Sequence, residues 1–108
     1  MNPSQVVEAL QELIQTNRKG SDALYEAEVE LARCENQLDT VEAKAFLMAT
    51  GSVAERSATA KLEASDARLE RDLAKAKVSR VRTKLKIIES EIMSHATMSK
   101  IMKAEMKL

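Results

Sequence analysis

The sequence predicts an all-α protein, a long antiparallel helical hairpin of the coiled-coil type with a short N-terminal helix. Three observations support this prediction. The 108 residues include two glycines, one proline and no tryptophan, and 31% are charged, a composition typical of long helices. Apolar residues recur at heptad spacing on both sides of the middle of the chain. Between these two regions, Gly51 is followed at once by a helix start signal at Ser52.

The first element is a short helix expected over residues 3–17. The residues that follow favour a helix end. Arg18 and Lys19 would lie near the negative end of the helix dipole, and Gly20 can terminate a helix. Ser21 can then begin the next helix, so the sequence predicts a boundary here.

The second element is a helix expected over residues 21–50, with an unbroken heptad pattern. Its a positions are Leu24, Leu31, Leu38 and Ala45, and its d positions are Ala27, Cys34, Val41 and Met48. Four successive heptads of this kind indicate a coiled-coil seam.

The third element is a helix expected over residues 53–105, after a turn at 51–52. Gly51 can adopt a positive φ, the Ser52 hydroxyl can accept from the N–H of Glu55, and the Glu55 carboxylate can reach back to the Ser52 N–H. In the second half of this helix, the a positions are Val78, Leu85 and Ile92, and the d positions are Ala74, Val81 and Ile88. In the first half, a second apolar face is formed by Leu62, Leu69, Leu73 and Ala76. Two apolar faces predict contact with two neighbours.

The position of the turn predicts a homo-oligomer. All three helices are expected to form one domain, residues 1–108. When the chain folds at Gly51, the second helix ends opposite about residue 80, so the apolar heptads beyond it would be covered only partly, by the first helix. With few aromatic side chains to bury, the chain is expected to cover these heptads with other subunits. The predicted interface consists of Val78, Val81, Leu85, Ile88, Ile92, Met102 and Met106.

Enzymatic activity and a membrane span are not expected. The chain has one histidine, His95, and one cysteine, Cys34, which would lie far apart in a hairpin, and it has no Gly-rich phosphate loop. A metal site needs three or four converging ligands, so we predict no metal, no cofactor, no small-molecule substrate and no enzymatic activity. The first 20 residues lack a long apolar run, which predicts no membrane span there. A single cysteine fits a reducing compartment, and we expect a cytoplasmic protein.

The charges are unevenly distributed along the chain. Residues 21–50 hold seven acids and two bases, whereas residues 73–108 hold nine bases and three acids. Residues 73–88, called the basic segment below, contain six bases and no acid: Lys75, Lys77, Arg80, Arg82, Lys84 and Lys86. At 100° per residue these bases form two rows that flank the apolar seam.

Three interpretations of the basic segment are open. The favoured one is binding to a nucleic-acid backbone, which needs little more than rows of bases on a stable helix. Because the segment contains no aromatic residue, base stacking is not available within it, and binding should be independent of sequence and sensitive to salt. The second interpretation is pairing with the acidic helix 21–50, where Lys75 and Lys77 could meet Glu26, Glu28 or Asp22. The third is binding to a membrane surface.

Three features follow one another along the chain: Glu42-Ala43-Lys44-Ala45, the turn Gly51-Ser52-Val53-Ala54-Glu55-Arg56, and a long basic helix with Ser94, Ser99 and Met-rich heptads. In this order the chain resembles small phage recombination mediators of the UvsY type. The resemblance implies a ring-forming helical protein that binds single-stranded DNA in the host cytoplasm. It also implies that the protein helps a recombinase displace the single-strand-binding protein.

The resemblance adds two candidate DNA-binding residues near the turn, Lys44 and Arg56. Family members carry bases on the helix before the turn; Lys44 matches one of them, and Phe46 stands where a second base is expected. The alternative function is a structural or adaptor coiled coil, for example a phage assembly or scaffold component, with no role at nucleic acid. The acidic e positions of the second helix, Glu28, Glu35 and Glu42, would then serve as partners for the bases.

Overall fold

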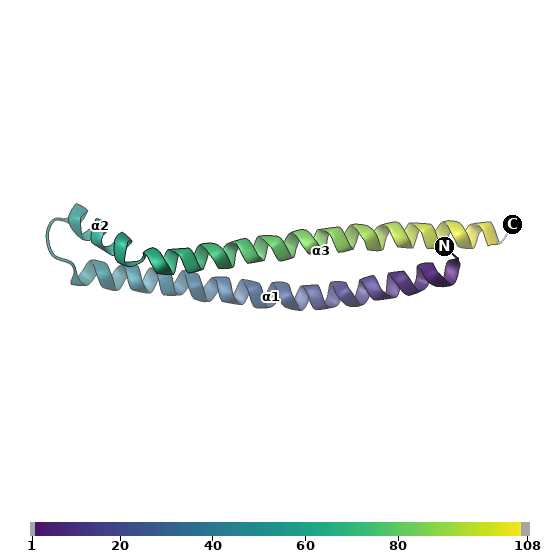
Figure 1. Cartoon of the computed structure of the whole chain (residues 1–108), viewed down its shortest axis with the longest axis horizontal. Helices are drawn as coiled ribbons and strands as arrows, with labels where there is room; N and C mark the ends of the chain where they lie inside the picture. The colour runs from purple at the N-terminus through teal and green to yellow at the C-terminus, as the bar shows by residue number, and fades with distance from the viewer. Residues whose placement is uncertain (1, 107–108) are drawn as a thin grey trace. The chain divides into compact units, whose positions relative to one another are not determined.

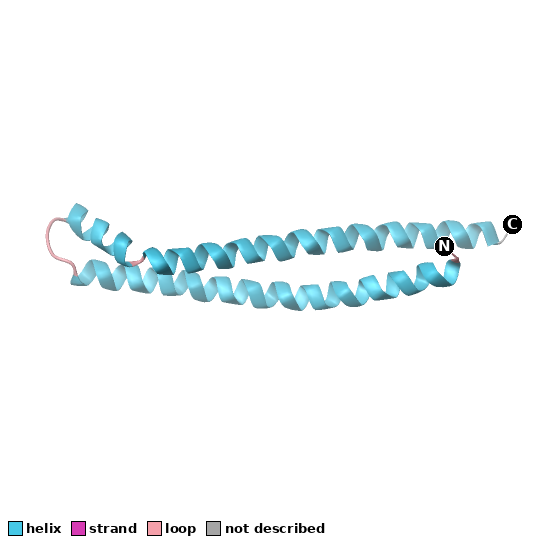
Figure 2. Ribbon diagram, viewed as in Figure 1, coloured by secondary structure: helices cyan, strands magenta, loops and turns pink. Residues whose placement is uncertain are grey.

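The computed structural model describes residues 2–106, which form three helices and no strand. The helices are α1 (Pro3–Met48), α2 (Val53–Glu63) and α3 (Ser65–Met106), shown in Figure 1 and Figure 2. Contacts divide the chain into two compact units: unit 1 is Met1–Leu24 with Arg80–Leu108, and unit 2 is Tyr25–Ser79. Within each unit a part of α1 lies antiparallel to a part of α3, which confirms the all-α helical hairpin class.

Unit 1 corrects the predicted N-terminal region, because α1 runs without a break through Gly20. The two helices expected over 3–17 and 21–50 are therefore one helix. Gly20 lies where α1 meets α3, and a Cβ at this position would overlap the Cδ2 atom of Leu85. Close packing against α3 offsets the roughly 1 kcal/mol that glycine costs inside a helix. The local signals for a helix end are thus overridden by tertiary contact.

The same continuity corrects the expected overhang of α3 beyond residue 80. Val6 and Leu85 are buried, and Ile88 and Ile92 are half-buried, so this part of α3 packs against the first half of α1. The seam contains one polar exception. The Oδ1 atom of Asn17 is buried without a hydrogen-bond partner among residues 2–106.

Small side chains make up most of the core of unit 2. The buried residues there are Ala27, Leu38, Ala45, Ala60, Ala64, Ala74 and Val78. Alanine on facing helices allows a close approach, so a thin two-helix layer still excludes water from its seam. The burial confirms the heptad pattern of the second predicted helix at three of its positions. The heptad pattern is wrong at Met48, which is exposed because α1 ends there.

The turn lies in the loop 49–52, and α1 ends at Met48 rather than at Thr50. Gly51 has a φ of 107°, in the left-handed region, as the sequence predicts. Ser52 caps α2, because its Oγ accepts from the N–H of Glu55 at 3.2 Å. The Glu55 carboxylate accepts from the Ser52 hydroxyl at 3.2 Å, in place of the expected bond from the Ser52 N–H.

Gly51→Ala is expected to lower the free energy of unfolding by about 1–2 kcal/mol. An L-residue rarely adopts this φ, and its Cβ would lie 2.5 Å from the Oε2 atom of Glu55, the residue whose Oε1 atom accepts from the Ser52 hydroxyl. Thermal denaturation followed by circular dichroism measures the change, and Thr50→Ala, at an exposed neighbouring position, is the control. Equal Tm values for Gly51→Ala and the parent would contradict the left-handed turn.

The helix expected over residues 53–105 is divided at Ala64, which corrects that prediction. Ala64 is buried and has φ −86° and ψ 4°, so α2 ends before it and α3 begins at Ser65. The Nη1 group of Arg68 donates to the Lys61 carbonyl oxygen at 3.4 Å and supplies a partner to a carbonyl at the break. Beyond it, α3 is continuous to Met106.

Candidate nucleic-acid interface

The basic segment lies on α3 with its seam buried and its bases exposed. Val78 and Leu85 are buried, and all six basic side chains are exposed to solvent. The bases form two rows on the helix: Lys75, Arg82 and Lys86 in one, and Lys77, Arg80 and Lys84 in the other. In each unit, α3 thus presents positive charge on both sides of its packed face, an arrangement suited to a polyanion.

Lys75 and Lys77 belong to unit 2, which also contains the acidic part of α1 with which they could pair. Among the described residues of that unit, neither lysine forms an ion pair. The pairs found in unit 2 join neighbours on one helix: Glu30 with Arg33 at 3.8 Å, and Asp72 with Arg71 at 2.7 Å. Both lysine charges are therefore available to a ligand.

In unit 1, α1 places a base beside the basic segment that the sequence did not indicate. Lys19 and Lys84 line a groove of about 340 Å³ that also includes Gly20 and Leu85. Local signals assign Lys19 to a helix end. The unbroken heptad register is the signal that would have placed it inside a helix, since Val6, Leu13, Gly20, Ala27 and Cys34 are seven residues apart.

In unit 2, an aromatic ring and a base of the basic segment line the same groove. A groove of about 700 Å³ is lined by residues of both helices: Tyr25, Glu26, Val29, Glu30, Arg33 and Lys77. Tyr25 is 68% exposed. Sequence reasoning missed this neighbour because Tyr25 and Lys77 are far apart along the chain, and only antiparallel packing brings them to one groove.

The two candidate bases near the turn differ in their surroundings. The Nε and Nη2 groups of Arg56 donate to the Phe46 carbonyl oxygen at 3.3 and 3.2 Å. The guanidinium also lies 4.4 Å from the centroid of the Phe46 ring. These contacts tie α2 to the last turn of α1 and satisfy a carbonyl at the helix end. Lys44 is exposed, so it is the more available of the two to a ligand.

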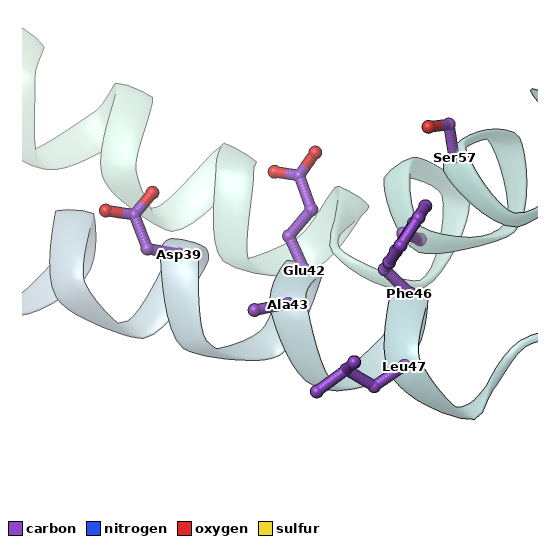
Figure 3. A pocket seen from close by; sticks show the side chains of 7 residues that line it. Asp39, Glu42, Ala43, Phe46, Leu47 and Ser57 are labelled. Atoms are coloured by element: carbon purple, nitrogen blue, oxygen red, sulfur yellow. The ribbon is translucent and has the colours of Figure 1, made fainter. Parts of the chain in front are cut away.

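Figure 3 shows an acidic groove of about 460 Å³ in unit 2. It is lined by Asp39, Glu42, Ala43, Phe46, Leu47, Ser57 and Ala60. Two carboxylates disfavour a nucleic-acid backbone at this place. Nor do they form a metal centre, since no three His, Cys, Asp or Glu side chains within residues 2–106 gather closely enough to hold an ion.

Cys34 and His95 both have partners within their own helices. The Cys34 Sγ–H donates to Glu30 Oε1 at 3.6 Å. Partial burial, then the charge and hydrogen bond of Glu30 and the charge of Glu70, raise the pKa of the Cys34 thiol. The thiol therefore stays protonated at neutral pH and is a poor nucleophile. The His95 Nδ1 atom lies 2.8 Å from the Glu91 carbonyl oxygen.

The residues predicted to form a subunit interface are largely covered within the chain. Val78 and Leu85 are buried, Val81, Ile88, Ile92 and Met102 are half-buried, and Met106 is exposed. The interface was predicted because the seam was expected to lack a full intrachain partner. That reason is wrong, because α1 covers the seam. Oligomerisation itself stays a prediction.

The second apolar face predicted for the third helix is separate from the seam, as expected. Leu62 on α2 and Leu69 and Leu73 on α3 are 75%, 57% and 57% exposed, all in unit 2. An exposed row of leucines is more consistent with a protein contact than with nucleic-acid binding.

Two further findings bear on the class of protein. Within residues 2–106, no helix contains an apolar stretch that could cross a bilayer. Comparisons with models of protein families, with curated proteins and with solved structures find no match to this chain. The likeness to UvsY-type mediators stays a prediction based on the turn and the basic helix.

Proposed function

We propose that the chain is a non-enzymatic protein that binds the phosphate backbone of single-stranded DNA along the basic segment of α3. The supporting observation is a run of six exposed bases without an acid. Within the described part of unit 2, Lys75 and Lys77 have no ion-pair partner. A coiled coil that used Lys75 and Lys77 for its own pairing would hold these two lysines against the acids of α1.

The proposed role is that of a recombination mediator similar to the UvsY type. The protein acts as a homo-oligomer in the host cytoplasm and helps a recombinase displace the single-strand-binding protein. The DNA contacts come from the basic segment, and Lys44 and Arg56 contribute near the turn. This role and these partners follow from the resemblance.

Binding of a labelled oligonucleotide of about 30 nucleotides is expected to weaken steeply with salt. Each phosphate contact to a single strand contributes a slope of about −0.7 in log K against log salt. Five or six contacts therefore predict a loss of about 100- to 300-fold between about 50 and 200 mM salt. Fluorescence anisotropy at several salt concentrations measures this, with oligonucleotides of different sequence expected to bind alike within a few-fold. No binding at low salt would contradict the proposal.

A second candidate is a structural or adaptor coiled coil, and the exposed Leu62, Leu69 and Leu73 favour it. On this alternative, the leucine face binds another protein or subunit, and the bases serve solubility or assembly. The particle mass with and without oligonucleotide distinguishes the two, because the adaptor forms its complexes without DNA.

A further inference from the structure

The groove between α1 and α3 in unit 2 combines three kinds of group that recognise a nucleotide. Tyr25 supplies an aromatic ring, Lys77 an ammonium group, and Glu26 a carboxylate. Two of the 108 residues are aromatic. Because aromatic residues are so rare in this chain, a random groove would not be expected to contain a ring together with a base of the basic segment. Phe46, the other aromatic residue, is engaged by Arg56.

Tyr25 does not serve the core of unit 2. Its side chain is 68% exposed, whereas Ala27, two residues further on, is buried in the seam. Among the residues that the structure describes, Tyr25 makes no hydrogen bond or ring contact. Its ring is therefore available to a ligand, and an aromatic face stacks with any nucleobase.

The charges in the groove direct how a strand would lie. Arg33 is paired with Glu30 at 3.8 Å, whereas Lys77 forms no ion pair in the described part of unit 2. A phosphate is therefore attracted to Lys77 and repelled by Glu26. Carboxylates accept hydrogen bonds from the amino groups of bases, so the acidic side of the groove suits a base and the Lys77 side suits the backbone.

We propose that Tyr25 is a stacking platform for a base of single-stranded nucleic acid, with Lys77 holding the adjacent phosphate. The inference rests on the proposed function and deepens it, because it names a contact to a base. It also changes the expectation from the basic segment alone, in which stacking is not available.

The chain has one tyrosine and no tryptophan, so its intrinsic fluorescence reports on Tyr25. Addition of an unlabelled single-stranded oligonucleotide at low salt is expected to quench this emission in a saturable manner. Inorganic polyphosphate, which has charge but no bases, is expected to bind without quenching. A duplex of the same sequence should also leave the emission unchanged, because its bases are stacked on each other.

Two substitutions separate stacking from charge. Tyr25→Leu removes the ring from an exposed site and is expected to weaken oligonucleotide binding about tenfold, with polyphosphate binding unchanged. Tyr25→Phe keeps the ring and is expected to bind the oligonucleotide like the parent. Lys77→Gln is expected to weaken both ligands. Circular dichroism checks that each variant keeps its helices.

The outcomes distinguish this inference from the proposed function. Oligonucleotide binding without quenching, and with equal affinity for Tyr25→Leu, overturns the stacking site and leaves backbone binding in place. Absence of binding by either polyanion at low salt overturns the proposed function and the stacking site together. Equal quenching by polyphosphate would also overturn stacking, because that ligand has no base.

Discussion

Leu85→Ala is expected to lower the free energy of unfolding by about 2–4 kcal/mol. Leu85 is 7% exposed and packs on α1 at Gly20, where α1 has no side chain to fill the space that the substitution leaves. Urea denaturation followed by circular dichroism measures the loss. Leu73→Ala is the matched control, because Leu73 lies on the same helix and is 57% exposed. It is expected to cost less than about 1 kcal/mol.

A double-mutant cycle tests the contact between Gly20 and Leu85 directly. Gly20→Ala gains about 1 kcal/mol of helix propensity but places a Cβ against Leu85 Cδ2, and overpacking costs about 1–3 kcal/mol. It is therefore expected to be neutral or destabilising in the parent. In the Leu85→Ala background the overlap is gone, so the same change is expected to stabilise by about 1 kcal/mol. Equal effects of Gly20→Ala in both backgrounds would show that these residues do not touch.

Lys84→Gln/Lys86→Gln is expected to weaken binding of single-stranded DNA by roughly 50-fold at about 50 mM salt. Losing two phosphate contacts reduces the slope of log K against log salt by about 1.4. If the variant and the parent bind equally at about 1 M salt, the difference in affinity grows as the salt is lowered and is largest in the low-salt condition. Both side chains are exposed, so the stability should stay within about 0.5 kcal/mol of the parent. Anisotropy titrations across a salt series give both the affinity and the slope.

The matched control for this variant is Lys100→Gln/Lys103→Gln. These lysines are exposed on the same helix and in the same unit. Their substitution removes the same charge, but outside the basic segment. The control is expected to change affinity by only a few-fold. If the two variants weaken binding equally, the affinity depends on the net charge and not on the basic segment.

The features that were correctly predicted are those that depend on neighbours in the chain. The capped turn at Gly51 and Ser52 depends on a few adjacent residues, so their types were enough to place it. The heptad positions of the long helices were predicted because burial on one face requires the 3.5-residue period. The basic segment could be recognised because all six bases lie within a few turns of one helix.

The errors at Gly20 and Ala64 both lie where the structure departs from local helix propensity. Local propensity favours a helix end at Gly20 and none at Ala64, by about 1 kcal/mol or less per residue. Packing on the opposite helix is worth more than this. At Gly20, packing against Leu85 accompanies an α1 helix that continues without a break. Ala64, where the helix divides, is buried. A weak local preference is decided by contacts that a single helix does not contain.

The helical class, the turn, the seam positions and the six bases of the basic segment could be predicted from the sequence alone. These follow from periodicity and residue type, which act over a few residues. Three further facts emerge from the packing of the helices: α1 covers the seam beyond residue 80, Lys19 and Lys84 line one groove, and Tyr25 and Lys77 line another. Such neighbours depend on the register between antiparallel helices. That register is set by side-chain packing across the seam, as where Leu85 fills the space above Gly20.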